Sequence, residues 1–246
     1  MIDLQIKTEN KGTYEQYKFY LPGMAEETVE EIKQDIKDIY NFKCISVCTL
    51  FGEIDMPLIR ACKEAKIKNV ISFNYALTCQ KPKEHYVHFY IDDYQFERIW
   101  SNPQKYLHIL KEFAGVIMPD FSLYMNLPKA VQIYNHYRNC LLGAYYQVNR
   151  INVIPNVSWS DQESFKWCLT AIPKNSIISI SSNGCLNKAT KHIFANNLKQ
   201  AVKTLKPIEL ICVGKLPEDI LSELPKKLKV TMFNSHSDNM RLRRGA

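Results

Sequence analysis

The sequence predicts an α/β protein, built as a (β/α)8 barrel-like parallel sheet with flanking helices and an extra N-terminal helix. Short β-branched apolar runs alternate with amphipathic helical segments, which is typical of parallel strands joined by right-handed crossovers. Eight such runs are present, and the length of 246 residues is close to the ~250 residues of one barrel of this type. An open doubly wound sheet is the alternative, because the connection over 75–85 is short and shows no clear helix.

Several of the predicted strands are continuously apolar, as expected for strands covered on both faces. The eight runs span residues 44–49, 69–74, 87–92, 115–120, 152–157, 176–181, 209–214 and 229–234. Helices between them begin at recognisable signals. Asn102 precedes Pro103 as an N-cap, and the segment 160–163 has the pattern of a capping box.

We expect a single α/β domain over 1–246, because no shift in composition marks a boundary. Residues 1–43 form an N-terminal extension, 44–236 the barrel-like core and 237–246 a basic tail. The extension carries a predicted amphipathic helix over 26–40, whose acidic residues cluster near its start, where the helix dipole favours them.

Composition excludes several classes of protein. Apolar residues make up 46% and charged residues 23% of the chain, which is typical of a globular protein rather than a disordered or fibrous one. No apolar run approaches the ~18 residues of a membrane-spanning helix. The eight cysteines are scattered and no secretory signal is evident, so we expect a cytoplasmic protein with reduced thiols and no membrane partner. The net charge of +7 is compatible with an anionic partner such as nucleic acid or a nucleotide.

The standard catalytic and nucleotide-binding motifs are missing from the sequence. It contains no GxGxxG, GxxxxGK[ST], GxSxG or HExxH pattern, which argues against the usual dinucleotide, P-loop, esterase and metalloprotease sites. The cysteines and histidines do not have the spacing of a zinc site. Any active site must therefore be sought from the predicted architecture.

Ligands bind beyond the carboxyl ends of the strands in both candidate architectures. Asp92 and Asp93 end one predicted strand and Asp120 ends the next. Because neighbouring strands lie ~4.8 Å apart, two such carboxylates can push their pKa values apart and act as acid and base. They are also candidates to share a divalent cation. The alternative is structural, with one Asp capping a helix and another pairing with Arg98 or Arg138.

Other polar and aromatic side chains share these predicted strand ends. Arg138, on a predicted helix over 128–146, is expected to brace a carboxylate, with Asp120 as the candidate. Trp159 is a candidate to stack on substrate, and His236 follows the last strand as a potential general base. The segment 182–184 resembles a phosphate-binding turn before a helix. The candidate substrate-binding residues are Asn74, Tyr124, Asn156, Ser158, Trp159 and Asn183.

Several strings resemble a domain-of-unknown-function family from low-GC Gram-positive bacteria, their phages and integrative mobile elements. The strings are FYIDDYQFERIW at 89–100, PDFSLY at 119–124, YRN at 137–139, GAYYQ at 143–147 and VIPNVSWS at 153–160. The resemblance covers about 44–234 and implies a cytoplasmic protein tied to mobile DNA, without an established activity. This chain departs from the family at Cys140, where other members have a second Arg, at Asn183, where they have Thr, and in the extension 1–43.

Two classes of function follow from these features. The first is an enzyme acting on a phosphorylated or nucleic-acid-derived substrate through Asp92, Asp93 and Asp120. The second is a non-catalytic module of a phage or mobile element. Such a module would hold nucleic acid through the tail residues Arg241, Arg243 and Arg244, or a host protein through the acidic helix.

Overall fold

The computed structural model describes residues 38 and 40–235. The predicted helix over 26–40, apart from positions 38 and 40, lies outside the described residues. The same holds for His236 and for the tail residues, which are Arg241, Arg243 and Arg244. Within the described part of the chain, no helix has the length and apolarity needed to cross a bilayer.

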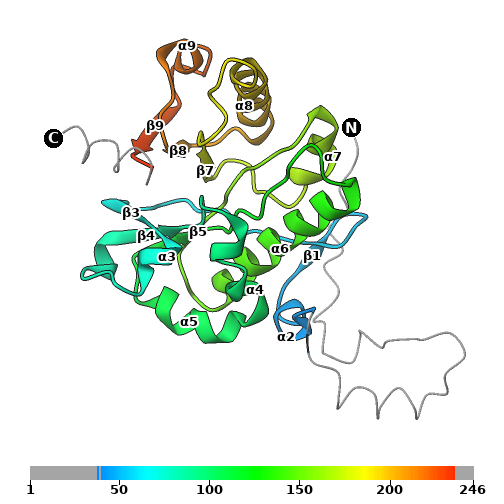
Figure 1. Ribbon diagram of the computed structural model, residues 1–246, viewed down its shortest axis with the longest axis vertical. Coiled ribbons are helices and arrows are strands. Elements are labelled where there is room, and N and C mark those ends of the chain that lie inside the picture. The colour runs from blue at the N-terminus through cyan, green and yellow to red at the C-terminus, as the bar shows by residue number, and fades with distance from the viewer. Residues whose placement is uncertain (1–37, 39, 236–246) are drawn as a thin grey trace, which may run out of the picture.

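The described residues form a mixed α/β structure (Figure 1). The strands are β1 (Leu50–Phe51), β2 (Met56–Pro57), β3 (Asn69–Ser72), β4 (His85–His88), β5 (Gly115–Ile117), β6 (Val153–Ile154), β7 (Ile177–Ser181), β8 (Glu209–Val213) and β9 (Lys229–Phe233). The α-helices are α2 (Phe42–Ile45), α3 (Phe73–Ala76), α4 (Arg98–Ser101), α5 (Pro103–Lys111), α6 (Lys129–Val148), α7 (Phe165–Cys168), α8 (Lys191–Leu205) and α9 (Glu218–Leu221). Short 3-10 turns are η2 (Pro82–Glu84), η3 (Asp93–Gln95) and η4 (Gln162–Ser164).

Parallel strands follow one another in chain order. One sheet has the order β3-β4-β5-β6 and a second has the order β7-β8-β9, all parallel. A parallel bridge between Asn156 and Ser179 continues the first sheet into the second. Parallel sheets with flanking helices are thus confirmed. A complete (β/α)8 barrel is not formed by the described residues, in which β3 and β9 do not pair, and the open-sheet alternative is compatible with this arrangement.

The prediction of a strand over 44–49 is wrong. Helix α2 occupies its beginning, because Asn41 adopts a left-handed conformation and the Asp38 carboxylate accepts a hydrogen bond from the Phe42 amide at 2.7 Å. Cys44 and Ile45 are buried, and α2 packs on α6. Their apolar character therefore reflects a helix face, and the chain continues into the antiparallel hairpin β1–β2.

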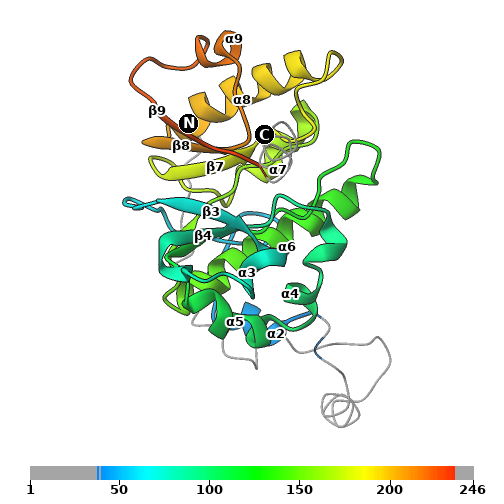
Figure 2. The same cartoon turned by 60° about the vertical axis from the view of Figure 1, so that its left-hand side comes forward.

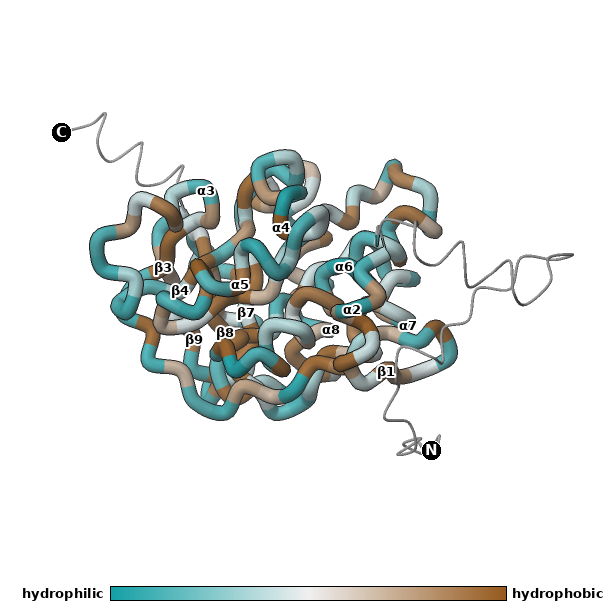
Figure 3. The backbone as a smooth tube through the Cα atoms, turned by 90° about the horizontal axis from the view of Figure 1, so that it is seen from below, coloured by the Kyte–Doolittle hydropathy of each residue, from teal (hydrophilic) through white to brown (hydrophobic). Residues whose placement is uncertain are grey.

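Two apolar clusters cover the two faces of the strands. Alternate positions such as Ile178 and Leu210 join the helices in the larger cluster. The intervening positions, such as Ile177 and Ile211, join Tyr86 of the other sheet in the smaller cluster. Figure 2 shows the two sheets facing each other, with α8 and α9 outside one and α5 and α6 outside the other. Brown, apolar backbone gathers around β7 and β8 in Figure 3.

A close contact at Gly115 lets β4 and β5 pair. A Cβ built at this position would overlap the ring of Tyr86 and lie 2.7 Å from the carbonyl oxygen of Asn152. We expect Gly115→Ala to lower the free energy of unfolding by about 2 kcal/mol, because a buried ring and a strand backbone must shift. Urea unfolding measures this loss. Gly143→Ala is the control with a smaller expected loss, since a Cβ there meets side-chain atoms of Met118 and Ile59 but no backbone atom. Equal losses in both variants would contradict the prediction.

Candidate active site

A cavity of about 1000 Å³ opens at the carboxyl ends of the parallel strands. Its walls come from the segments that follow β4, β5, β6, β7 and β8, together with Ser235 after β9. Seven of the residues singled out in the sequence line it, namely Asp92, Asp120, Tyr124, Asn156, Ser158, Trp159 and Asn183. The sheet therefore brings together side chains that are up to 91 positions apart in the chain, from 92 to 183.

Asp120 is held in the cavity wall by a chain of hydrogen bonds. The side-chain amide of Asn156 donates to Asp120 Oδ1 at 2.7 Å. The Tyr90 hydroxyl lies 3.0 Å from Asn156 Oδ1 and 2.8 Å from Ser179 Oγ. Because Tyr90 donates to the amide oxygen of Asn156, the NH2 group of that amide faces Asp120. All of these groups except Asp120 itself are buried.

Burial raises the pKa of Asp120 from its ordinary value of 3.8 to about 6. Desolvation is the largest cause, since the charged carboxylate loses much of its contact with water. Hydrogen bonds from the side chains of Asn156 and Ser158 oppose this rise, whereas the nearby charge of Asp93 adds to it. Burial also raises the pKa of Tyr90 well above its usual range, so this hydroxyl stays protonated at neutral pH.

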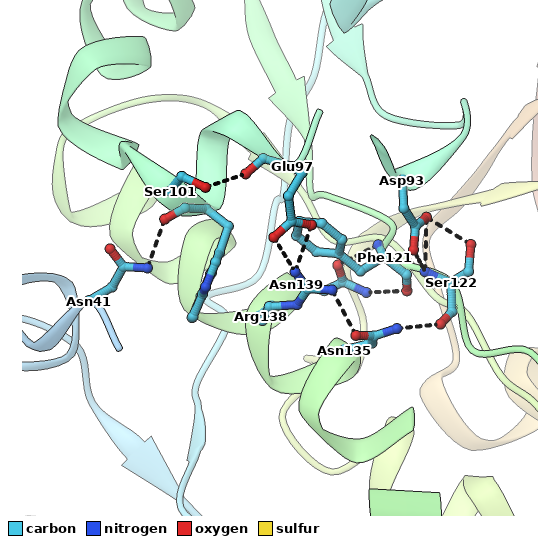
Figure 4. Close-up of polar contacts among 10 residues, drawn as sticks. Asn41, Asp93, Glu97, Ser101, Phe121, Ser122, Asn135, Arg138 and Asn139 are labelled. Atoms are coloured by element: carbon cyan, nitrogen blue, oxygen red, sulfur yellow. Dashed lines mark hydrogen bonds and ion pairs between the residues drawn. The ribbon is translucent and has the colours of Figure 1, made fainter. Parts of the chain in front are cut away.

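Asp92 and Asp93 occupy different environments. Asp92 is exposed, borders the cavity and accepts a hydrogen bond from Gln95 Nε2 at 3.3 Å. Asp93 does not line the cavity. Its carboxylate accepts hydrogen bonds from the Ser122 amide at 3.1 Å and the Ser122 hydroxyl at 2.8 Å (Figure 4). Asp93 therefore fixes the segment after Asp120. This structural role differs from the helix cap and the Arg98 or Arg138 pairing that the sequence suggested.

Arg138 contacts Glu97 rather than Asp120, so the expected brace on Asp120 is corrected. Its Nη1 lies 2.8 and 2.9 Å from the two carboxylate oxygens of Glu97. Its guanidinium carbon also lies 3.7 Å from the centre of the Phe121 ring. Helix α6 carries Arg138 beside the start of α4, and Figure 4 shows its guanidinium next to Glu97, Asn135 and the ring of Phe121.

Two asparagines on α6 hold the backbone that follows Asp120. Asn139 accepts a hydrogen bond from the Phe121 amide at 2.7 Å and donates to the Phe121 carbonyl at 3.1 Å. Asn135 donates to the carbonyl oxygen of Ser122 at 2.7 Å and accepts from Arg138 Nη2 at 2.8 Å. These two roles were not predicted from the sequence. The available signal was the spacing of Asn135, Arg138 and Asn139 on one face of a predicted helix.

Asn74 and Trp159 make contacts within the protein. Asn74 accepts a hydrogen bond from Ser72 Oγ at 2.7 Å and donates to Gln95 Oε1 at 3.0 Å, outside the cavity. The Trp159 ring borders the cavity but stacks on Phe165, with ring centres 6.0 Å apart and an interplanar angle of 18°. It also packs against Phe194 at 5.7 Å. Asn74 thus ties two strand-end segments together.

The segments after β7 and β8 form a second side of the cavity. A turn over 182–185 closes with a hydrogen bond from the Cys185 amide to the Ser182 carbonyl at 3.2 Å, and Gly184 has a φ of +73°. Gly214 has a φ of +119°, and a Cβ there would overlap Ser182 Oγ. Glycine therefore lets the two segments touch and brings Lys215 to the cavity. Lys215 was not among the residues predicted from the sequence.

Metal binding has limited support in the side chains. Within residues 38 and 40–235, no group of three or more His, Cys, Asp and Glu is arranged to hold a metal ion. The carboxylates of Asp92 and Asp120 are among the groups that line the cavity, and carboxylate oxygens are ligands that divalent cations prefer.

Comparisons with known proteins give a family and two phage relatives. A family model described as "Domain of unknown function (DUF4417)" matches residues 50–233. The chain is 37% identical over 141 residues to the Gene 1 protein of Mycobacterium phage L5, which covers 57% of this chain and 62% of that protein. It is 34% identical over 131 residues to the Gene 1 protein of Mycobacterium phage D29, covering 53% and 48%. No solved structure matches.

The chain thus spans about half to three fifths of the length of these curated relatives. The two relatives confirm the phage link that the sequence resemblance implies. An origin in low-GC Gram-positive bacteria stays an expectation.

Proposed function

The chain belongs to the DUF4417 family, a domain of unknown function, and we propose that it is an enzyme in which Asp120 acts as a general base on a phosphorylated substrate. The observation that carries this proposal is the position of Asp120. It is a carboxylate in the wall of a cavity of about 1000 Å³, and burial raises its pKa to about 6. A base with a pKa just below the working pH is both charged and basic enough to accept a proton.

The surroundings of Asp120 support a role in proton transfer. Asn156 donates a hydrogen bond to Oδ1 of the carboxylate and is itself oriented by the Tyr90 hydroxyl. The carboxylate is therefore held in one orientation. The neighbouring backbone is fixed by Asn139 and by Asp93. Such fixed geometry is what general-base catalysis requires, because a misplaced base loses much of its effect.

A phosphate group fits the other side of the cavity. Lys215 is exposed there, and it makes no ion pair with any of the described residues. An ammonium group in this position offsets the negative charge of a phosphate. Hydroxyl groups of Ser181 and Ser182 lie in the same wall. The cavity therefore offers a base on the β5 side and a cation on the β8 side.

The proposed reaction is hydrolysis of a phosphate ester. Asp120 takes a proton from a water molecule as the water oxygen bonds to phosphorus. The bond between phosphorus and the ester oxygen breaks, and the released alcohol oxygen takes a proton from solvent. Asp120 then returns its proton to solvent. Lys215 stabilises the charge on the non-bridging oxygens during this step.

The pH dependence of hydrolysis tests this function. Release of p-nitrophenol from p-nitrophenyl phosphate and bis(p-nitrophenyl) phosphate is measured between pH 4.5 and 8.5, with and without Mg²⁺. Because the base must be ionised, kcat/KM should rise about tenfold for each pH unit below the pKa of Asp120. It should level off above about pH 6, the pKa to which burial raises this carboxyl.

Asp55→Asn serves as the control, because Asp55 is exposed and lies outside the cavity. This variant should keep the profile of the wild-type protein. A flat profile, or hydrolysis of neither ester above the rate in buffer, would overturn the proposal.

A further inference from the structure

We propose that the substrate of this cavity is a nucleotide, with Tyr124 as the residue that stacks on its base and Lys215 as the residue that binds its phosphate. This inference rests on the proposed function, because it names the substrate class of the same site. It depends on three observations about the cavity, which are an exposed aromatic ring, a separation of charges and a matching size.

Tyr124 presents an open aromatic surface at the cavity. Its side chain is 59% exposed although it lines the cavity. No other aromatic ring among the described residues contacts it. The backbone around it is nevertheless well held, because the Leu127 amide donates to the Tyr124 carbonyl at 3.0 Å and Asp93 fixes Ser122. A large ring that is exposed but anchored is a ready stacking surface for a planar base.

Trp159 does not offer the same surface. One face of its indole stacks on Phe165, and Phe194 packs against it as well. A base that entered the cavity would have to displace one of these rings in order to stack on it. Tyr124 therefore fits the stacking role that the sequence analysis gave to Trp159, and Trp159 extends the apolar wall behind it.

Charges on the two sides of the cavity match the two ends of a nucleotide. Asp92 is exposed on the β4 side, next to Gln95, and both side chains carry oxygens that accept hydrogen bonds. The amino and imino groups of a base are donors of this kind. Lys215 lies on the β8 side, where a phosphate would meet a positive charge.

The size of the cavity agrees with this ligand. Its volume of about 1000 Å³ is at the upper end of the range for small-molecule sites, about 300–1,000 Å³. A sugar phosphate would satisfy Lys215 but would leave the ring of Tyr124 uncovered. A nucleotide fills both sides. The same chemistry is present in a free mononucleotide and in the terminal nucleotide of a single strand.

Calorimetric titration of the full chain tests the inference. The ligands are AMP, UMP, adenosine, ribose 5-phosphate and a 5′-phosphorylated single-stranded hexanucleotide. We expect a mononucleotide to bind at least about tenfold more tightly than either adenosine or ribose 5-phosphate. Tighter binding of the hexanucleotide would identify a strand end as the source of the nucleotide, and tighter binding of AMP or UMP would identify the free form. Equal affinity for ribose 5-phosphate and AMP would overturn the inference.

Two pairs of variants separate the base from the phosphate. Tyr124→Ala should weaken AMP binding by about fivefold or more without changing the affinity for ribose 5-phosphate, and Tyr124→Phe should restore AMP binding. Tyr94→Ala is the matched control, because Tyr94 is 79% exposed but lies outside the cavity. Lys215→Ala should weaken AMP but not adenosine, with Lys203→Ala, an exposed position on α8, as its control. Equal effects of Tyr124→Ala and Tyr94→Ala would contradict the stacking role.

These titrations distinguish failure of the inference from failure of the proposed function. If AMP binds with the expected dependence on Tyr124 and Lys215 but no ester is hydrolysed, the nucleotide site stands and the hydrolytic function is overturned. The opposite result is hydrolysis of p-nitrophenyl phosphate whose kcat/KM levels off above about pH 6, while AMP binds no better than ribose 5-phosphate. In that case the hydrolytic function stands and a nucleotide is excluded as the substrate.

Discussion

Replacing Asp120 with Asn is expected to lower kcat/KM for phosphate-ester hydrolysis by about 100-fold or more and, at pH 7, to stabilise the fold. Asparagine keeps an oxygen that accepts the hydrogen bond from Asn156, now 2.7 Å from Asp120 Oδ1, but it cannot take a proton. The loss of activity therefore comes without the loss of the hydrogen bond to Asn156. A structural role for Asp120 predicts the opposite combination, in which activity and stability fall together.

The direction of the stability change follows from the pKa of Asp120. Burial raises this pKa from 3.8 to about 6 in the folded protein, so the folded state binds the proton more tightly than the unfolded state. Stability contributed by this group is therefore full below about pH 3.8 and is lost as the pH rises through about 6. The difference corresponds to about 3 kcal/mol at neutral pH, and partial access of Asp120 to water reduces the expected gain to about 2 kcal/mol.

Urea unfolding at pH 7 and at pH 4 measures this effect. Asp120→Asn should be more stable than the wild-type protein at pH 7, and the difference should shrink towards zero at pH 4, where both side chains are neutral. Asp55→Asn provides a comparison at an exposed aspartate. If the two proteins differ in free energy of unfolding by the same amount at both pH values, the charge of Asp120 does not destabilise the folded protein.

Arg138→Ala is expected to lower the free energy of unfolding by about 3 kcal/mol. The Arg138 side chain is only 10% exposed, whereas that of its partner Glu97 is 45% exposed. Glu97 can therefore regain water when the guanidinium is removed, which keeps the loss at the lower end for a buried ion pair. The stacking of the guanidinium on Phe121, at 3.7 Å from the ring centre, adds to the loss.

Comparison of three variants by urea unfolding separates these contributions. Glu97→Gln should cost about 1 kcal/mol, because it removes a half-exposed charge and keeps the packing. Arg138→Lys should fall between Glu97→Gln and Arg138→Ala. Lysine retains the charge but lacks the second nitrogen that contacts Asn135 and the planar group that stacks on Phe121. A loss in Arg138→Ala no larger than that in Glu97→Gln would show that the stacking contributes nothing.

The strand-end residues could be located from sequence because a parallel sheet places the carboxyl ends of its strands along one edge. That rule needs only the approximate position of each strand. It therefore held for Asp120 and Asn156, although β6 spans only Val153–Ile154. The prediction of the first strand was wrong because an apolar segment as short as 44–49 is compatible with one turn of helix as well as with a strand.

The contacts around Arg138 could not be predicted in the same way. Glu97 and Arg138 are 41 positions apart, and no local sequence pattern indicates that α6 and the start of α4 meet in the folded structure. Lys215 was missed for a different reason. Exposed lysines are common on any protein surface, and only the close approach of Gly214 to Ser182 brings this one to the cavity.

The seam between the two sheets runs through the same place as the cavity. Two backbone hydrogen bonds cross it, from the Val157 amide to the Ser179 carbonyl and from the Ser179 amide to the Pro155 carbonyl, both at 2.8 Å. Asn156 lies between these bonds in the chain and donates a hydrogen bond to Asp120. A molecule bound by Asp92 or Tyr124 at one end and by Lys215 at the other would contact both sheets and stabilise their junction. Occupancy should accordingly slow amide hydrogen exchange at Val157 and Ser179 more than at the centres of β4 and β8.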